Sequence, residues 1–331
     1  MNRINIFIVF LILFSFVPSL VQARTADEWY NEGVDLDMDE KYAEAINAFD
    51  EALKINPNLA KAWYKKGKAL VQLKRYDEAI NSFDEALKIY PKYALASHNK
   101  GMAWYNKGVT LVNLGSYEEA IKAFDEALKI NPQYADALYN KGNALVNLGS
   151  YEEAIKAFDE ALKINPKYVN AWTNKGFALL MLGRYEEAIT SYDNALELNP
   201  KNADARKGKG GALLGVGKYE DAIASFDIAL ELNLQYAEAW LGKGMAYDRL
   251  GKYEDAIVSF VRALELNPQY ADAWYNKGIA LDKLGRTKEA EKAFERAYEL
   301  DPALKRPQTS GFDFVTGMFM VFEAGYLLRR R

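Results

Sequence analysis

The strongest constraint on this chain is a pattern of aromatic and small residues that returns every 34 positions. Trp29 and Trp63 keep this spacing, as do Tyr42 and Tyr76, and a later tyrosine series continues it at Tyr117, Tyr151, Tyr185, Tyr219 and Tyr253. Such self-similarity means that one supersecondary unit is copied along an array. The 331 residues would otherwise suggest about two domains, whereas repeats predict a single elongated array.

Each copy of the pattern contains two helical stripes. In residues 60–93, Trp63, Gly67 and Leu70 lie three to four positions apart, and a second stripe runs from Tyr76 to Leu87. Pro91 then ends the second helix, because proline lacks the amide hydrogen that a helix needs. Most other copies end the first helix with a glycine that suits a left-handed cap, namely Gly115, Gly149, Gly183 and Gly251.

The order Trp, Gly, Tyr, Ala, Phe, Ala and Pro within 34 residues resembles the tetratricopeptide repeat. The resemblance covers residues 26–304 and implies an all-α fold, a right-handed solenoid of eight antiparallel helix-turn-helix repeats. The repeats it implies are 26–59, 60–93, 101–134, 135–168, 169–202, 203–236, 237–270 and 271–304.

Two departures from the period carry predictions. Residues 94–100 are seven extra residues, nearly two helical turns, so we expect one lengthened helix over about residues 93–114. The sixth repeat has Arg206 in place of tryptophan and several glycines within one helix, each costing about 0.8–1 kcal/mol relative to alanine. We predict that this repeat is the least stable and that the array bends there.

The composition argues against catalysis and against nucleic acid as a partner. The net charge is −4, so the chain lacks the basic surface that phosphates require. It has no cysteine and a single histidine, His98, which excludes cysteine chemistry and leaves no support for a metal cluster or catalytic triad. Residues 111–132 and 145–166 are identical, as suits a scaffold. We expect a non-catalytic protein with no cofactor and no metal.

The family resemblance implies that the first helices line a concave groove where peptides bind. Rigid tyrosines lose little entropy on binding, and asparagine amides pair with a peptide backbone of any sequence. The candidate groove residues are Tyr30, Tyr64, Tyr105, Tyr139, Tyr275, Asn31, Asn106, Asn140, Asn174 and Asn276. The alternative is that they fill space between adjacent first helices.

Acidic residues recur near the expected groove edge, at Asp27, Asp136, Asp204, Glu238 and Asp272. They favour extended or basic peptide partners. The alternative is a solvated charged face.

The first 23 residues are typical of a secretory signal peptide. Arg3 precedes a nearly continuous apolar stretch, residues 4–17, and Val21 and Ala23 are small residues before a cleavage point. The alternative is a retained membrane anchor. We expect export.

The last segment, residues 305–331, contains an apolar stretch at 312–328 followed by three arginines. A helix of that stretch would span about 25 Å, slightly less than a bilayer core of about 30 Å. Asp313, Thr316 and Glu323 share one helical face, so the segment can instead be an amphipathic cap over the last repeat. The segment resembles the PGF-type sorting tails of archaeal surface proteins, with Ser310 where proline is expected. The resemblance implies attachment to the outer face of the cell membrane.

Two functions follow from this pattern. The first is an exported, membrane-tethered scaffold that binds protein segments in its groove. The second is a structural component of the cell envelope that self-associates through its repeats and apolar tail.

Overall fold

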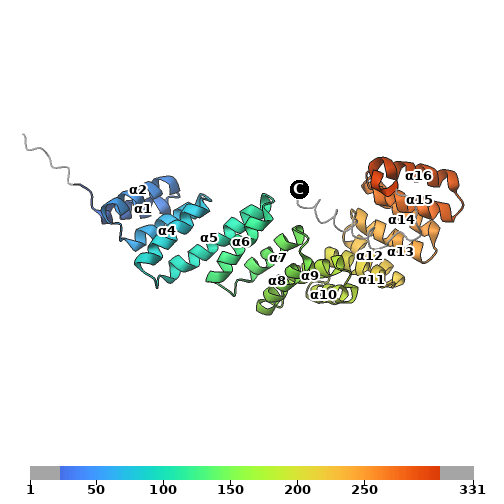
Figure 1. Cartoon of the computed structure of the whole chain (residues 1–331), viewed down its shortest axis with the longest axis horizontal. Helices are drawn as coiled ribbons and strands as arrows, with labels where there is room; N and C mark the ends of the chain where they lie inside the picture. Colours follow the sequence, from blue (N-terminus) through green and yellow to red (C-terminus); the bar gives the residue numbers. More distant parts are fainter. Residues whose placement is uncertain (1–22, 306–331) are drawn as a thin grey trace, which may run out of the picture. The chain divides into compact units, whose positions relative to one another are not determined.

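The computed structural model describes residues 23–305, which form sixteen α-helices and one terminal 3-10 helix, η1 (Pro302–Lys305) (Figure 1). The helices pair as antiparallel hairpins, and the all-α tetratricopeptide solenoid predicted from the sequence is confirmed. Most of the expected signal peptide, residues 1–22, and nearly all of the expected C-terminal segment, residues 306–331, lie outside the described residues.

The first helices of the hairpins are α1 (Ala26–Met38), α3 (Ala60–Gln72), α5 (Ala94–Asn113), α7 (Ala135–Asn147), α9 (Val169–Met181), α11 (Ala203–Gly215), α13 (Ala237–Arg249) and α15 (Ala271–Lys283). The second helices are α2 (Tyr42–Ile55), α4 (Tyr76–Ile89), α6 (Tyr117–Ile130), α8 (Tyr151–Ile164), α10 (Tyr185–Leu198), α12 (Tyr219–Leu232), α14 (Tyr253–Leu266) and α16 (Thr287–Leu300). α5 is the single lengthened helix expected there, with 20 residues where the other first helices have 13.

The chain divides into two compact units, and the boundary falls within α5. Unit 1 ends at Ser97 and contains the hairpins α1–α2 and α3–α4. Unit 2 begins at His98 and contains the second helix α6 and the five hairpins from α7 to α16. Each unit is described by itself below.

The core of each hairpin is an aromatic ring of the second helix that lies against a glycine of the first. Phe83 and Phe124 are fully buried, and a Cβ atom added to Gly67 or Gly108 would lie 2.6 Å from the ring that it faces. Any larger residue would therefore displace a buried ring. The same pairing joins Gly33 to Phe49, Gly142 to Phe158, Gly176 to Tyr192, Gly210 to Phe226, Gly244 to Phe260 and Gly278 to Phe294.

Successive hairpins are joined by a repeated ion pair. In unit 2, Lys175 Nζ lies 2.6 Å from Asp159 of the preceding second helix and 5.3 Å from the ring centroid of Trp172. The indole N–H of Trp172 donates to the carbonyl oxygen of Pro166, at 3.0 Å, so the same joint also anchors the turn between hairpins. The same 2.6 Å ion pair recurs at Lys66–Asp50, Lys141–Asp125, Lys209–Asp193 and Lys243–Asp227.

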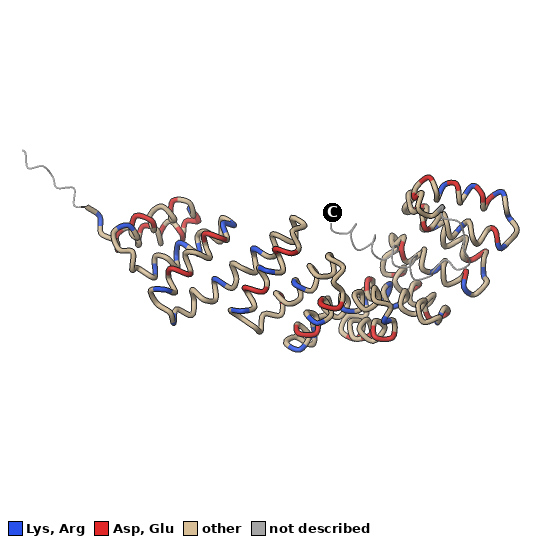
Figure 2. Tube along the Cα trace, viewed as in Figure 1, with Lys and Arg blue, Asp and Glu red and all other residues tan. Residues whose placement is uncertain are grey.

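The turn inside six of the hairpins contains a glycine with positive φ, as predicted for four of them. These residues are Gly115, Gly149, Gly183, Gly217, Gly251 and Gly285, with φ between 71° and 79°. Glu40 and Lys74 take the corresponding place in unit 1 with φ of 58°, a conformation that costs a residue with a side chain more than it costs glycine. Acidic and basic residues alternate along much of α16 (Figure 2).

The glycines of α11 serve packing. This helix continues without a break from Ala203 to Gly215. A Cβ atom at Gly210 would lie 2.8 Å from the Phe226 ring, and one at Gly215 would lie 2.7 Å from the Tyr185 ring. Part of the helix-propensity cost expected from the sequence is therefore offset by close ring contacts. The lower stability of this repeat and the bend at it stay predictions.

Within residues 23–305, every helix is too short or too polar to span a bilayer. Nearly all of residues 305–331, for which membrane attachment is predicted, lies outside the described residues.

Two glycines in α5 provide a test of the ring–glycine packing. We expect Gly108→Ala to lower the free energy of unfolding by about 1–3 kcal/mol, because the new methyl group would overlap the Phe124 ring. Gly101→Ala is the control, since its Cβ atom would lie 3.3 Å from the flexible Ile130 side chain and alanine favours the helix by up to about 1 kcal/mol. Denaturant unfolding followed by circular dichroism measures both, and equal midpoints for the two variants would contradict the packing argument.

Candidate peptide-binding groove

The first helices lie on the inner side of the array within each unit. In unit 2, α7 contacts α9, α9 contacts α11, α11 contacts α13 and α13 contacts α15, and in unit 1 α1 contacts α3. Among the helices described, no second helix makes comparable contact with the next second helix. Because the first helices lie closer to one another than the second helices do, the concave face is on the side of the first helices. This is the side for which the groove is predicted.

The candidate tyrosines are packed between rings of their own repeat. In unit 2, the Tyr105 ring lies 6.0 Å from Phe124 and 4.8 Å from Tyr134, centroid to centroid. Tyr139 has the same 6.0 and 4.8 Å distances, to Phe158 and Tyr168.

The remaining tyrosines follow the same arrangement. Tyr30 and Tyr64 of unit 1 pack on Phe49 and Phe83, and Tyr275, which is only 5 % exposed, packs on Phe294. These contacts match the space-filling role that was the alternative to peptide binding, and peptide contact by the tyrosines stays a prediction.

The candidate asparagines of unit 2 join one first helix to the previous one. The Asn140 amide donates to the Tyr105 hydroxyl at 3.2 Å and to the Asp136 carbonyl oxygen at 2.9 Å. The Asn174 amide donates to the Tyr139 hydroxyl at 3.2 Å and to the Asn143 side-chain oxygen at 2.6 Å. Nδ2 therefore faces the protein in both cases. Neither Oδ1 atom accepts a hydrogen bond from the residues the structure describes.

The other candidate asparagines differ in their surroundings. The Asn276 amide donates only to its own helix, to the Asp272 carbonyl oxygen at 2.8 Å. Asn106 is half-buried, and Asn31 of unit 1 is exposed. The structure thus brings Tyr105, Asn140, Tyr139 and Asn174 together as one hydrogen-bonded row on α5, α7 and α9.

A second kind of joint replaces this row further along unit 2. Thr173 of α9 and Lys207 of α11 replace the tyrosine. The helices that follow them, α11 and α13, carry Gly208 and Gly242 in place of the asparagine. A Cβ atom at either glycine would overlap a ring of the preceding hairpin, Tyr192 or Phe226. Sequence reasoning missed this coupling. The replacement of Asn by Gly in two successive first helices at one register was the signal that would have revealed it.

The acidic residues at the groove edge accept hydrogen bonds from the last tyrosine of their own repeat or from a lysine of the next repeat. In unit 2, the Tyr168 hydroxyl donates to Asp136 and the Tyr236 hydroxyl to Asp204, both at 2.9 Å, and in unit 1 Lys61 pairs with Asp27 at 3.0 Å. Burial and the hydrogen bond to Asp136 raise the pKa of Tyr168. The acidic residues are therefore part of the joints between repeats as well as a source of negative charge.

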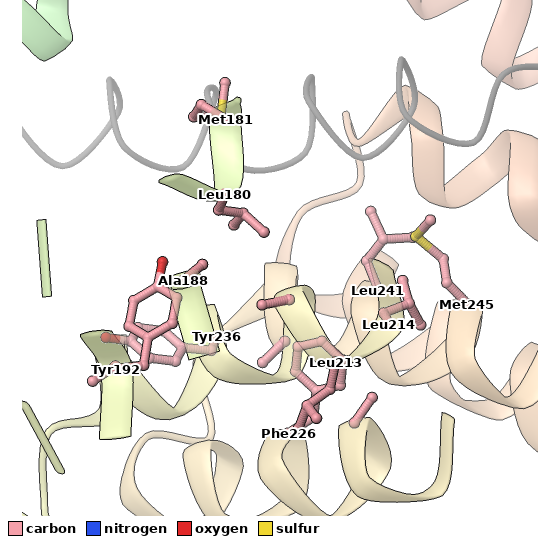
Figure 3. Packing of buried hydrophobic residues seen from close by; sticks show 14 of the residues in the cluster. Leu180, Met181, Ala188, Tyr192, Leu213, Leu214, Phe226, Tyr236, Leu241 and Met245 are labelled. Carbon is pink, nitrogen blue, oxygen red and sulfur yellow. The ribbon is translucent and has the colours of Figure 1, made fainter. Parts of the chain in front are cut away.

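A buried apolar cluster of unit 2 includes side chains from three first helices. They are Leu180 and Met181 of α9, Leu214 of α11, and Leu241 and Met245 of α13, here called the apolar strip (Figure 3). Sequence reasoning did not single them out, because at helical spacing they resemble ordinary core positions.

Other chemistry-bearing groups are sparse in residues 23–305. His98 on α5 is exposed, and no group of three or more His, Cys, Asp or Glu side chains there has a geometry that would hold a metal ion.

Asp272 at the groove edge gives a pH-dependent prediction. Burial, with a smaller effect from the Asp301 charge, raises the pKa of its carboxyl to about 6, above the ordinary value near 4. The folded chain holds the Asp272 proton more tightly than the unfolded chain does, so protonation of this carboxyl stabilises the fold. This stabilisation is complete below about pH 4 and is lost as the pH rises through about 6.

We therefore expect Asp272→Asn to stabilise the chain by roughly 2–3 kcal/mol at pH 8 relative to its effect at pH 4. The helix N-terminus favours a negative charge by about 0.3–1 kcal/mol, which offsets part of the gain. Thermal unfolding at the two pH values measures the difference. An effect that does not change with pH would argue against a raised pKa at this carboxyl.

The chain is similar to several solved structures. Among solved structures, it is similar to MamA from Desulfovibrio magneticus RS-1, with 26 % identity, a TM-score of 0.47, and coverage of 52 % of this chain and 97 % of that chain. It is also similar to YrrB, described as a tetratricopeptide-repeat protein with an unusual peptide-binding site, with 24 % identity, a TM-score of 0.45, and coverage of 62 % and 99 %. A third is the thermophilic protein TTC0263 of Thermus thermophilus, with 26 % identity, a TM-score of 0.45, and coverage of 55 % and 98 %.

No curated protein sequence matches the chain. Two family models, both described as tetratricopeptide repeat, match it; one covers residues 30–94, 95–135, 105–169, 209–262 and 244–304, and the other covers residues 169–202. These matches span most of the sequence, and the chain belongs to the tetratricopeptide-repeat family.

Proposed function

We propose that this chain is a non-catalytic scaffold that binds segments of other proteins in the concave groove of unit 2. The observation that carries the proposal is the orientation of Asn140 and Asn174. Each amide nitrogen is held by the protein, while Oδ1 keeps its acceptor capacity. A backbone N–H of an extended peptide is the matching donor, whatever the peptide sequence.

The charge at the groove edge indicates which peptides fit best. Asp136 and Asp204 each accept a hydrogen bond from the last tyrosine of their own repeat, and a carboxylate has two oxygens that together accept several donors. Negative charge near the groove attracts basic segments and raises their association rate at low salt. We therefore propose extended, net basic protein segments as the ligand class.

An affinity capture experiment tests the groove assignment. The mature chain, residues 24–331, is immobilised beside Asn140→Ala/Asn174→Ala and beside Lys122→Ala/Lys156→Ala, which alters equivalent exposed positions on α6 and α8. We expect a defined protein to be retained by the native chain and the lysine variant and lost from the asparagine variant. Circular dichroism checks that all three are folded.

Equal capture by all three would contradict binding in the groove. Capture of the chain by itself alone, with assembly that grows with concentration in light scattering, would instead support the self-associating envelope component.

We also propose that the chain is exported and tethered at the outer face of the cell membrane. The support is the charged, apolar and small-residue order of residues 1–23, together with the apolar stretch and terminal arginines of residues 305–331. Export would place the groove where it meets proteins outside the cell.

Expression with the native leader tests this placement. We expect the mature protein to begin at Arg24, and Ala23→Arg to block cleavage because the site requires a small residue. A chain lacking residues 306–331 should move from the membrane fraction to the soluble fraction. An unprocessed native chain, or a membrane fraction unaffected by the deletion, would contradict export or tethering respectively.

A further inference from the structure

The repeated ion pair between hairpins is absent from the last joint of unit 2, between α14 and α15. A lysine stands three residues after the tryptophan position in seven of the eight first helices. Five of these lysines lie 2.6 Å from an aspartate of the preceding second helix. On α14 the aspartate is replaced by Val261, so Lys277 of α15 lacks the partner that the equivalent lysines have.

Lys277 has no other ion pair among the described residues. Its Nζ atom lies 4.9 Å from the centroid of the Trp274 ring. Glu289 of α16 acts on its charge from further away, but both carboxylate oxygens of Glu289 accept hydrogen bonds from Arg286, at 2.8 and 2.6 Å. Burial lowers the pKa of the Lys277 ammonium, as expected for a half-buried charge that no carboxylate balances.

The surface beside Lys277 also differs in charge from the other joints. At the α6–α7 joint, the equivalent surface is a shallow hollow of about 540 Å³ whose lining includes Glu126 and Glu160. Four repeats later, these two positions hold Arg262 of α14 and Arg296 of α16. The last joint therefore has a valine in place of the aspartate and arginines in place of the two neighbouring glutamates.

The two arginines keep donors for an incoming anion. Nη1 of Arg262 pairs with Glu265 at 2.6 Å, and Nη1 of Arg296 pairs with Glu299 at 2.9 Å. A guanidinium group has five N–H donors, so each arginine retains several beyond this contact. Val258 of α14, which is 60 % exposed, adds apolar surface at a position equivalent to another residue of the hollow, Lys122.

The intact joints show from which side a carboxylate reaches such a lysine. Their aspartate side chains remain 39–50 % exposed although they lie 2.6 Å from the lysine Nζ atom. The lysine is therefore accessible to a carboxylate that approaches from solvent. Val261 is about as large as aspartate, so an incoming carboxylate would meet the flexible Lys277 side chain just outside the valine methyl groups.

We propose that Lys277, Arg262 and Arg296, together with Val258 and Val261, form a docking site for an acidic segment of another protein. These five residues are here called the Lys277 site. A glutamate or aspartate of the segment pairs with Lys277, as the aspartate does in the other joints. Further carboxylates pair with the arginines, and an apolar residue of the segment contacts the valines. The valines favour a protein segment over a small anion, because a small anion has no apolar surface to bury.

The Lys277 site differs from the groove in position and in charge. The groove is formed by first helices and carries acidic residues such as Asp136 and Asp204. The Lys277 site lies between the second helices α14 and α16 and is basic. The inference therefore does not rest on binding in the groove. A scaffold with both sites holds a basic segment and an acidic segment at the same time.

Peptide titration tests the Lys277 site. The mature chain, residues 24–331, is added to a short fluorescein-labelled peptide of glutamate and leucine, and fluorescence anisotropy follows binding. We expect Lys277→Gln to weaken binding at least about tenfold, because the charged hydrogen bond is lost. The matched control is Lys243→Gln, which breaks an intact pair with Asp227 and should leave peptide affinity unchanged. Equal affinities of the two variants would overturn the proposal, as would a native chain that does not bind.

A second variant keeps the test valid if Lys277→Gln does not fold. Val261→Asp introduces the aspartate that the other joints have, so it should fold and its carboxylate should occupy Lys277. We expect this variant also to weaken peptide binding at least about tenfold, and unchanged binding would contradict the site. Circular dichroism checks the fold of every variant.

Further measurements identify the source of the negative charge. A peptide with glutamine in place of glutamate should not bind, and equal binding would reject recognition of carboxylates. Displacement of the glutamate peptide by an equal concentration of inorganic phosphate would reassign the site to a free anion. Binding to phosphatidylglycerol vesicles that Lys277→Gln abolishes would reassign it to a lipid surface. Self-assembly in light scattering that the same variant abolishes would reassign it to a second copy. Each of these results would overturn the proposal.

The groove variant separates this inference from the proposed function. Asn140→Ala/Asn174→Ala should bind the glutamate peptide as the native chain does. Loss of the peptide from this variant would place the acidic segment in the groove and overturn the Lys277 site. If the asparagine variant fails to lose a captured protein but Lys277→Gln loses the peptide, the groove assignment is rejected and the Lys277 site is supported.

Discussion

Everything else in this fold depends on the contact between a buried aromatic ring and a helix glycine. A first helix and a second helix approach closely because the glycine has no side chain, and the ring fills the remaining space. Burying one such ring stabilises the hairpin by roughly 1.5–3 kcal/mol. One hairpin cannot bury both of its faces alone, so the stability of each depends on its neighbours. The Lys–Asp pairs provide that join, each exposed enough to contribute only about 0–1 kcal/mol.

Repetition makes the hairpins predictable and makes the groove difficult to predict. The 34-residue period places Phe83 and its copies in the core and Gly115 and its copies in left-handed turns, because these roles depend on local geometry alone. The hydroxyl of Tyr105, in contrast, is bonded by Asn140 of the next repeat. That contact depends on which residues two neighbouring copies carry together. Periodicity identifies equivalent positions but does not say which partners share a joint.

The same reasoning explains why the apolar strip escaped prediction. Leu180 and Met181 follow the helical spacing of core residues and are buried, so the sequence alone does not separate them from the rest of the core. At the Met181 position most other first helices carry polar residues, whereas at the Leu180 position three of them carry valine, namely Val71, Val112 and Val146. Gly208 and Gly242 are a similar case. In the sequence they resemble residues that weaken a helix, and their packing role is evident only when the Tyr192 and Phe226 rings are placed beside them.

Recognition in this groove must come from the first helices. Residues 111–132 and 145–166 are identical and include the whole of α6 and of α8, so two second helices present the same side chains. The first helices instead carry Tyr139, Thr173, Lys207 and Leu241 at one register. Under the proposed function, a segment lying across them would meet the hydrogen-bonded residues of α7 and α9 and then the Lys207 position of α11. Such a change in chemistry along the groove would favour one register of a bound segment over another, which a uniform array would not do.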